Sequence, residues 1–273
     1  MGGSFPRFQD PFEAQIRQVR EQLLYPVTEA EFADFKKQLG EIDPSHVGAL
    51  LVEPIQGRGG KVVPHKEFLA ALRLWCDENE VVLIFDEIYT GFHRTGKLWA
   101  CEWEQITPDV ICLGKALSGG YPISACVGLA QVMDQWPKSQ GEALHTSTFL
   151  GNPVGCAMAL ASIGLHRNEA LELQVLEKGR LLKQALGAMK VPFVAQIRGR
   201  GLMIGVELSA SNGQTSGEIA GKVLSRMLAK GVIMLADGDE GNVLALTPPF
   251  DLNQEALVYV VNTLEQVLLE AAG

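Results

Sequence analysis

Two charged residues, Asp86 and Lys115, stand at the ends of short apolar runs and are the first candidates for chemistry. The run 81–85 leads into Asp86, and about thirty residues later the run 110–113 leads through Gly114 into Lys115. Runs of this length that are rich in β-branched residues indicate strands buried on both faces. Ligands of open α/β sheets bind at the carboxyl ends of the strands, and a charge at such a place needs a partner. We therefore expect the Asp86 carboxylate and the Lys115 amine to contact one ligand.

The composition narrows the class of protein. The 273 residues, of which 47% are hydrophobic and 20% charged, are enough for a large core and two lobes. The formal net charge of −9 disfavours nucleic acid or an anionic membrane as the main partner, and no apolar run has the length of a membrane span. The five cysteines include no C-x-x-C pair, a pattern typical of reduced cysteines in the cytoplasm. We expect a cytoplasmic protein without a metal site.

Hydrophobic spacing and turn residues predict strands that alternate with helices. Strands are expected at 47–52, 81–86, 108–113, 123–129, 193–197, 202–208, 232–235 and 243–246. Helices are expected at 12–24, 28–39, 66–78, 153–165, 169–189, 218–229 and 253–271. The order strand, helix, strand with short joints is typical of a parallel crossover. We therefore predict an α/β fold with a mostly parallel sheet, followed by a smaller C-terminal α+β domain.

Two of these helices begin at recognisable capping residues. Thr28, with Glu31 three residues later, is a capping-box pattern. Asn152 before Pro153 combines an N-cap side chain with a proline in the first turn. Both patterns predict a helix start at that point of the chain.

Several motifs in a fixed order point to one protein family. EPIQG stands at 53–57, FDEIYTGFHRTGK at 85–97, GKALSGG at 114–120, TFLGNP at 148–153 and RGRGLMIGVEL at 198–208. In this order they resemble the motifs of class III aminotransferases, the ornithine/4-aminobutyrate aminotransferase type of the pyridoxal-phosphate enzymes of fold type I. Several independent motifs in the right order make a chance match improbable. The resemblance implies that 46–165 is part of a large domain that binds pyridoxal phosphate and that 166–273 is a small domain.

The resemblance assigns roles around pyridoxal 5'-phosphate to four residues. It implies that Lys115 forms the Schiff base and that Asp86 pairs with the pyridinium nitrogen, which keeps the ring an electron sink. Ile88 resembles the apolar residue that packs against the ring face, and Gln56 resembles the glutamine that hydrogen-bonds the phenolic oxygen. Each residue also has an ordinary structural alternative: a solvated lysine, a helix cap or salt bridge, a core residue and a turn residue.

Thr148 is the candidate for a contact with the cofactor phosphate. It precedes the predicted helix start at Asn152, where free N–H groups favour a phosphate. The resemblance has this threonine reach across an interface to the cofactor of a second subunit, which implies a homodimer. The alternative is a loop threonine with local hydrogen bonds.

Arg58 and Ala245 depart from the family pattern. Many relatives have, at the position of Arg58, a glutamate that pairs with a C-terminal arginine, and Ala245 stands where that arginine is expected. The loss of both members is self-consistent, because a lone charge in the pocket would be costly. We hypothesise that Arg58 meets a carboxylate of the substrate, or that the substrate differs from the glutamate type. Arg198 is a second candidate for a substrate carboxylate, or an arginine that holds the fold.

Two family features are absent from the sequence upstream of residue 47. They are a Gly-Thr/Ser-Glu-Ala-type phosphate cradle and, near a Phe-His-Gly-type motif, an aromatic residue that stacks on the ring. We therefore expect an N-terminally truncated chain, with reduced phosphate affinity and an uncovered sheet edge. Residues 1–45 are expected to form an N-terminal helical segment whose role the sequence does not indicate.

The predicted function is the transfer of an amino group from an amine or amino acid to a keto acid, with Lys115 moving the proton. Two alternatives stay open at this point. The same lysine and aspartate would serve a class III aminomutase, decarboxylase or epimerase. The chain could also be a catalytically silent fragment, or half of a split enzyme, that acts by association.

Overall fold

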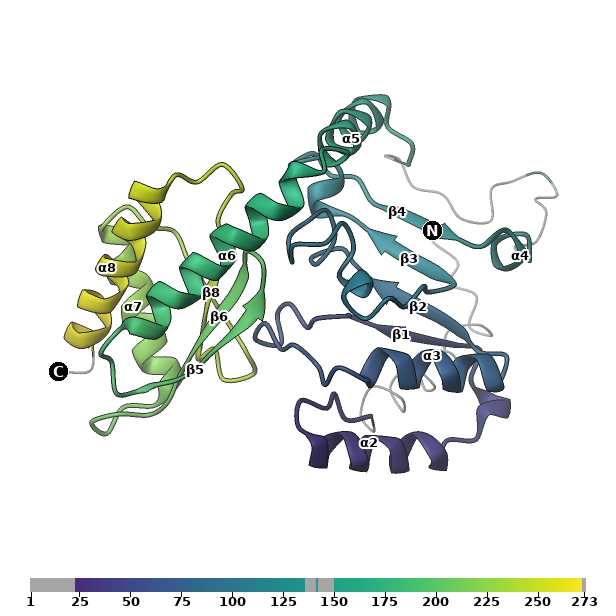
Figure 1. The fold of residues 1–273 in the computed structure, drawn as a ribbon, viewed down its shortest axis with the longest axis horizontal. Helices are drawn as coiled ribbons and strands as arrows, with labels where there is room; N and C mark the ends of the chain where they lie inside the picture. The colour runs from purple at the N-terminus through teal and green to yellow at the C-terminus, as the bar shows by residue number, and fades with distance from the viewer. Residues whose placement is uncertain (1–22, 136–140, 142–149, 272–273) are drawn as a thin grey trace.

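Two four-stranded sheets organise the chain, with the order β1-β2-β3-β4 in the first and β5-β6-β8-β7 in the second (Figure 1). The structure is a computed structural model and describes residues 23–135, 141 and 150–271, so most of the predicted helix 12–24 lies outside it. The strands are β1 (Ala49–Val52), β2 (Val82–Asp86), β3 (Val110–Leu113), β4 (Ala125–Gly128), β5 (Val194–Arg200), β6 (Met203–Leu208), β7 (Leu235–Asp237) and β8 (Val243–Leu246). The α-helices are α2 (Glu29–Glu41), α3 (Phe68–Glu78), α4 (Ala130–Met133), α5 (Pro153–His166), α6 (Ala170–Ala188), α7 (Ser216–Ala229) and α8 (Gln254–Ala271). The 3-10 turns are η1 (Pro44–His46), η2 (Ala100–Trp103) and η3 (Lys115–Leu117).

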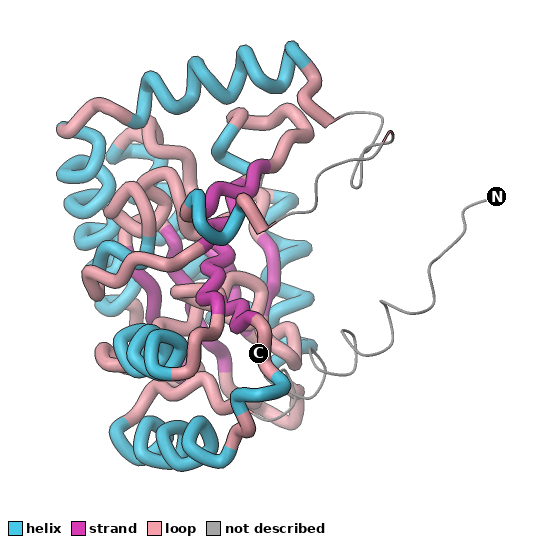
Figure 2. The backbone as a smooth tube through the Cα atoms, turned by 90° about the vertical axis from the view of Figure 1, so that its right-hand side faces the viewer, coloured by secondary structure: helices cyan, strands magenta, loops and turns pink. Residues whose placement is uncertain are grey.

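The first sheet contains the predicted parallel crossover. β1 pairs with β2 and β2 with β3 in parallel, whereas β4 returns antiparallel to β3. The helix α3 connects β1 to β2 and packs with α2 against these strands, in a core that includes the buried Phe35, Leu72 and Phe85. Seen from the side, the strands run through the middle with most helices around them (Figure 2). The predicted α/β arrangement is confirmed, and it brings the carboxyl ends of three strands to one edge.

The second sheet is antiparallel throughout and carries the C-terminal core, on which α6, α7 and α8 pack. Two predicted strands were wrong in their bounds. β5 continues to Arg200, beyond 193–197, because Gly199, at a φ of +121°, lets the backbone of Met203 come closer than any Cβ would allow. β7 begins at Leu235, where the predicted strand ends, because its pairing with β8 runs back from the turn at 238–241.

The predicted capping residues are confirmed at both helix starts. Thr28 accepts a hydrogen bond from the Glu31 N–H, and the Glu31 carboxylate accepts one from the Thr28 N–H at 2.8 Å. Asn152 accepts hydrogen bonds from two N–H groups in the first turn of α5. The helix α7 begins earlier than predicted, because Thr215 and Glu218 form a second capping box that the sequence analysis did not use.

The loop around Arg94 joins the first sheet to the turn between β5 and β6. The Arg94 guanidinium donates to the Leu202 carbonyl at 3.1 Å, and the Leu202 N–H donates to the Arg94 carbonyl at 3.0 Å. Gly201, in the turn, has a φ of +54°, and a Cβ there would collide with the backbone of Thr95 and Gly96. The two lobes therefore meet backbone against backbone at this turn.

None of the described helices combines the length and the apolar composition that a membrane crossing requires. Within the described ranges, no three His, Cys, Asp or Glu side chains are grouped as ligands of a metal ion. All five cysteines are free.

Gly201→Ala should lower the free energy of unfolding by about 2–4 kcal/mol, because a Cβ there combines a left-handed backbone with a collision against backbone atoms of Thr95. Chemical denaturation followed by circular dichroism measures the change. Gly213→Ala is the matched control, since Gly213 also has a positive φ, +78°, but an added Cβ meets no atom within 4 Å. The control should lose only about 1 kcal/mol, and equal losses in both variants would contradict the packing argument.

Candidate active site at the carboxyl ends of the first sheet

The three parallel strands bring Glu53, Asp86 and Lys115 to one edge of the first sheet. Glu53 directly follows β1, Asp86 is the last residue of β2, and Lys115 lies two residues after β3. The register pairs Asp86 with Cys112, three residues before Lys115. Burial raises the pKa of the Glu53 carboxyl. Of the two neighbouring charges, that of Asp86 raises this pKa further and that of Lys115 lowers it. The two residues that the sequence singled out first therefore share one edge with a third charge.

Lys115 stands in a conformation that an ordinary residue rarely adopts. Its φ is +44°, in the left-handed region, at the start of the short turn η3. Such backbone strain is concentrated at functional sites. The Lys115 Nζ lies 4.6 Å from the centroid of the Tyr89 ring, and among the described residues it has no hydrogen-bond partner. The amine is therefore held over a ring and available to a ligand.

Asp86 and Ile88 lie beside the strand that leads to Lys115. The Asp86 Oδ1 accepts a hydrogen bond from the Ile88 N–H at 3.0 Å, and no described cation forms a salt bridge with this carboxylate. The Ile88 side chain packs against Gly114, where an added Cβ would lie 3.2 Å from the Ile88 Cγ2. A carboxylate, an apolar side chain and an amine thus follow one another along this edge.

Tyr89 and Lys61 are site residues that the sequence analysis missed. The Tyr89 ring contacts two ammonium groups, because the Lys61 Nζ lies 4.3 Å from its centroid. Lys61 is fully buried, with a φ of +58°, and donates hydrogen bonds to the Tyr89 hydroxyl at 3.1 Å and to the Gly57 carbonyl at 3.3 Å. Tyr89 lies inside the motif at 85–97 and could have been singled out there. Lys61 follows two glycines, and nothing in the neighbouring sequence indicates that its side chain is buried.

Glu53 and Gln56 belong to the loop that follows β1. The Glu53 Oε2 accepts a hydrogen bond from the Gly57 N–H at 2.8 Å. The Gln56 N–H donates to the Val62 carbonyl at 3.0 Å, which closes the loop around Lys61. Glu53 therefore orients the loop that carries Gln56.

A third unpredicted residue, Tyr25, supports this loop from the other side. Its hydroxyl donates to the carbonyl oxygens of Glu53 and Pro54, each at 3.0 Å. Burial, with the nearby Glu53 charge, raises the pKa of the Tyr25 phenol well above its ordinary value, so the hydroxyl stays a donor.

The structure places the remaining predicted residues away from a common ligand contact. Arg58 Nη1 lies 2.5 Å from a carboxylate oxygen of Asp237. Arg198 donates to the Gly60 carbonyl at 2.7 Å and forms a salt bridge with Glu207 at 2.5 Å. These protein contacts favour the fold-holding role of Arg198 over the substrate-binding one.

Two predicted positions remain, Ala245 and Thr148. Ala245 is buried in β8, opposite Gly205 and Leu235, so no cation replaces the family arginine at this place. Thr148 lies outside the described residues.

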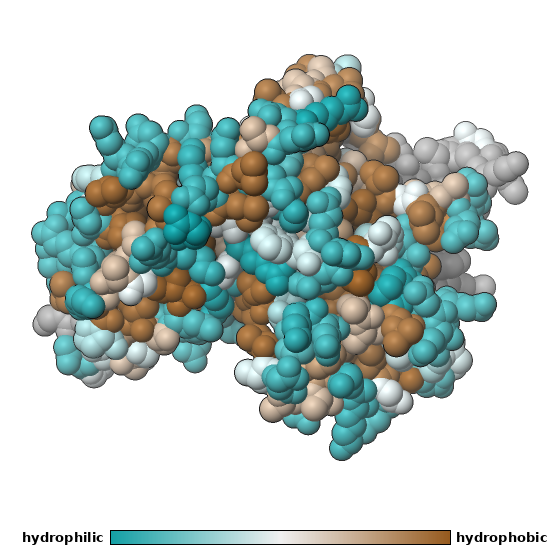
Figure 3. Space-filling view, viewed as in Figure 1, coloured by the Kyte–Doolittle hydropathy of each residue, from teal (hydrophilic) through white to brown (hydrophobic). Residues whose placement is uncertain are grey.

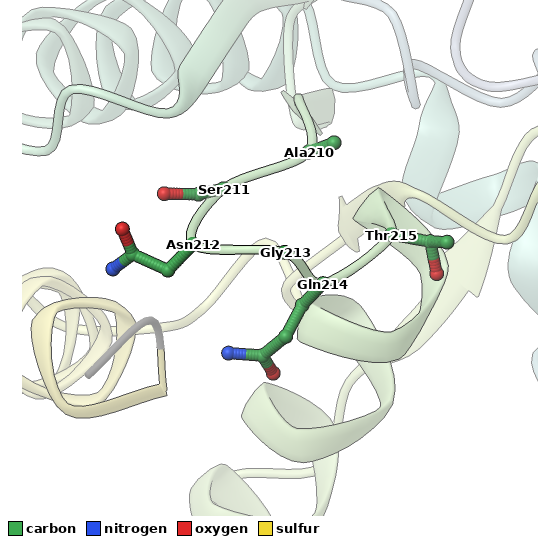
Figure 4. A pocket seen from close by; sticks show the side chains of 6 residues that line it. All are labelled: Ala210, Ser211, Asn212, Gly213, Gln214 and Thr215. Carbon is green, nitrogen blue, oxygen red and sulfur yellow. The ribbon is translucent and has the colours of Figure 1, made fainter.

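Two cavities lie elsewhere on the surface. One, of about 350 Å³, is formed by the loop 210–215 between β6 and α7, and Figure 4 shows that only small or polar uncharged side chains line it. The other, of about 500 Å³, lies at the amino end of β3, between Trp99 and Leu129. Neither cavity is lined by Asp86 or Lys115. The candidate site is therefore defined by the arrangement of its side chains and not by one of these cavities.

Known proteins are similar to this chain in sequence and in fold. The class III aminotransferase family pattern matches residues 5–268. The 4-aminobutyrate aminotransferase of Mycobacterium leprae is 39% identical over 85% of this chain and 51% of its own length, and ornithine aminotransferase 1 of Staphylococcus aureus is 35% identical over 90% and 59%.

Solved structures agree with the sequence matches. The acetylornithine aminotransferase of Elizabethkingia anophelis has a TM-score of 0.76 at 33% identity, covering 87% of this chain and 58% of its own. A transaminase from the marine bacterium Virgibacillus has a TM-score of 0.79 at 28% identity, covering 90% and 58%. The chain spans about half to three fifths of the length of these relatives.

The family match covers nearly the whole chain, and the motifs at 53–57, 85–97 and 114–120 meet at one edge of the sheet. Both the resemblance to class III aminotransferases and the predicted α/β fold are confirmed. The chain belongs to the class III aminotransferase family and has the fold of its members, fold type I.

Proposed function

We propose that the protein is a pyridoxal-phosphate-dependent aminotransferase that moves an amino group from an amine or amino acid to a keto acid. The observation that carries this proposal is the common edge of Asp86, Ile88 and Lys115. These residues fit the ring end of the cofactor, since an unpartnered amine suits its aldehyde and a carboxylate without a cation suits its basic nitrogen. When bound, pyridoxal 5'-phosphate supplies an aldehyde and a ring that withdraws electrons from the substrate carbon.

Lys115 supplies the nucleophile and the proton carrier of this proposal. Its Nζ would hold the cofactor aldehyde in the absence of substrate, and a substrate amine would take its place. The Lys115 amine would then be free to take a proton from the substrate carbon and to return it to the acceptor carbon next to the substrate nitrogen. The absence of a hydrogen-bond partner for Nζ among the described residues supports both tasks, because the amine exchanges no existing bond.

Asp86, Ile88 and Gln56 orient the cofactor in this proposal. The Asp86 carboxylate would keep the ring nitrogen protonated, and Ile88 would pack against the ring face. The Gln56 side-chain amide would donate a hydrogen bond to the phenolic oxygen of the cofactor. Glu53, which accepts from the Gly57 N–H, keeps the Gln56 loop in place.

We further propose a homodimer in which Thr148 contacts the cofactor phosphate of the neighbouring subunit. Exposed apolar side chains on and next to α5 support an interface there, since monomers rarely leave a contiguous apolar patch uncovered. They are Leu150 at 60% exposure, Val154 at 55%, Leu160 at 71% and Leu165 at 74%. Apolar atoms are visible at the top of Figure 3, where α5 lies in Figure 1.

We also propose the division into 1–45, 46–165 and 166–273, with the large lobe ending where α5 ends. Separate cores support it. Ala159 of α5 shares a buried cluster with Leu117 of η3, whereas α6 contributes Val175 and Leu182 to the C-terminal core. A cytoplasmic location is proposed from the free cysteines.

Addition of pyridoxal phosphate to the protein should produce the visible absorption of a cofactor bound as an imine, and Lys115→Ala should abolish it. Borohydride reduction followed by peptide mass spectrometry should locate the cofactor on Lys115. Lys66→Ala, at an exposed lysine before α3, is the control and should keep the absorption. Cofactor attached at another lysine, or unchanged absorption in Lys115→Ala, would refute the assignment.

Asp86→Asn should lower kcat by on the order of 10²–10³-fold while the cofactor remains attached, because a fixed opposite charge at the ring nitrogen is lost. The rate should be measured with and without a keto acid acceptor, since only a transaminase requires one for turnover. Asp77→Asn, at an exposed aspartate in α3, is the matched control and should retain the rate. Turnover that needs no acceptor would favour an aminomutase, decarboxylase or epimerase instead.

Leu160→Asp should convert the dimer to monomer, because it places a charge in the proposed apolar interface. Sedimentation velocity measures the change. Leu228→Asp, on α7 and 61% exposed, is the matched control and should leave the mass unchanged. A wild-type protein that sediments as a monomer, or a Leu160→Asp variant that stays dimeric, would reject this interface.

A further inference from the structure

Two cysteines, Cys112 and Cys126, face each other across the last two strands of the first sheet. In the antiparallel register of β3 and β4 they are direct partners. Directly opposite residues of antiparallel strands have Cα atoms about 4.5–5.5 Å apart and side chains on the same face of the sheet. A disulfide spans Cα separations of roughly 4.4–6.8 Å. The backbone therefore holds this pair at the separation that a disulfide requires.

The side chains of the pair are in contact and differ in exposure. Burial raises the pKa of the Cys112 thiol, and the charge of Cys126, the charge of Asp86 and a hydrogen bond with the Cys126 side chain raise it further. Cys112 is half-buried, whereas Cys126 is exposed on β4, the outer strand of the sheet (Figure 1). A reagent in solution therefore reaches Cys126 first, and Cys112 stands behind it as the second thiol.

The pair also lies in line with the candidate site. Cys112 is the register partner of Asp86 on β2, and its carbonyl accepts a hydrogen bond from the Glu87 N–H at 3.0 Å. Register partners in neighbouring strands direct their side chains to the same face of a sheet. Asp86, Cys112 and Cys126 therefore form a row across three strands, with the carboxylate at one end and the exposed thiol at the other.

The remaining cysteines have no such arrangement. Cys76 and Cys101 are buried, and burial raises the pKa of both thiols, that of Cys76 to about 11. Cys156 is exposed on α5, outside both sheets, and no strand pairing brings a second cysteine opposite to it. Because buried thiols of high pKa are inert, Cys112 and Cys126 are the pair that the fold prepares for oxidation.

We propose that Cys112 and Cys126 are a reversible thiol–disulfide pair, oxidised by small disulfides of the glutathione type. The Cys126 thiolate attacks one sulfur of glutathione disulfide, whose S–S bond breaks and releases the first glutathione thiolate. The Cys112 thiolate then attacks the Cys126 sulfur, a bond forms between the two cysteines, and the second glutathione leaves as a thiolate. Two electrons pass from the cysteine sulfurs to glutathione, and the two cysteine protons go to the released thiolates.

The reverse reaction needs only reduced glutathione. Exposed disulfides are the labile and regulatory ones, and disulfides of cytoplasmic proteins are usually transient. The closing step is coupled to the candidate site, because the Asp86 charge disfavours the Cys112 thiolate. This pair goes beyond the proposed amino-group transfer, since its oxidation requires neither cofactor nor substrate.

Incubation of the full chain with glutathione disulfide should join the peptides that contain Cys112 and Cys126. Blocking of free thiols followed by non-reducing peptide mass spectrometry measures the link, and dithiothreitol should break it. Cys156 is the control within the same chain and should carry glutathione, because it is exposed without a second cysteine opposite to it. Peptides of Cys112 and Cys126 that stay unlinked at saturating glutathione disulfide would overturn the proposal.

The variant Cys112→Ser separates closure from simple exposure. Without the second thiol, Cys126 should keep the glutathione that the wild type loses when the internal bond forms. The serine differs from cysteine by one atom, so the strand pairing is retained. Equal retention of glutathione on Cys126 in the variant and the wild type would show that Cys112 does not displace it, which contradicts the proposed pair.

The variant Asp86→Asn tests the coupling to the candidate site. The internal bond should replace the glutathione on Cys126 faster in this variant, because more of Cys112 is thiolate at a given pH. Acid quenching and mass spectrometry measure the rate without cofactor, so the result is independent of the proposed aminotransferase activity. Asp77→Asn, at an exposed aspartate of α3, is the matched control and should close at the wild-type rate. A rate in Asp86→Asn equal to that of the wild type would refute the coupling.

Discussion

The parallel pairing of β1, β2 and β3 is the constraint on which the rest of the structure depends. Because parallel strands end at the same edge, Glu53, Asp86 and Lys115 meet there although two crossovers separate them in the chain. The crossover helix α3 and the preceding α2 hold these strands by burying Phe35 and Phe85 in one core. The charges are thus positioned by an apolar core that contains none of them.

The loop 57–61 transmits this arrangement to the second lobe. Its carbonyls at Arg58 and Gly60 accept hydrogen bonds from Gly238 and Arg198, and its Lys61 forms a buried ion pair with Asp237. A buried ion pair is favourable only when both partners stay in place. The position of the C-terminal sheet and the charge balance around the site are therefore coupled.

The ion pair at this loop differs from the pair that the family pattern predicts. The family pattern expects a glutamate at position 58 and an arginine at 245, whereas this chain has Arg58 and a buried alanine. The carboxylate instead comes from Asp237, the last residue of β7. Leu235 of the same strand pairs with Ala245 of β8. The polarity of the pair is reversed, so the cation that faces solvent belongs to the large lobe.

The sequence by itself determined what depends on neighbouring residues: the capping boxes, the crossover, the cores of the strands and the motif residues Asp86 and Lys115. Apolar periodicity and capping act within one element, so they can be recognised along the chain. Only the tertiary structure decided the burial of Lys61 and its pairing with Asp237, which lies 176 residues away. It also decided that Tyr89 lies under two lysines. These contacts depend on how the two lobes meet, and a lysine after two glycines has the same local sequence whether it is buried or solvated.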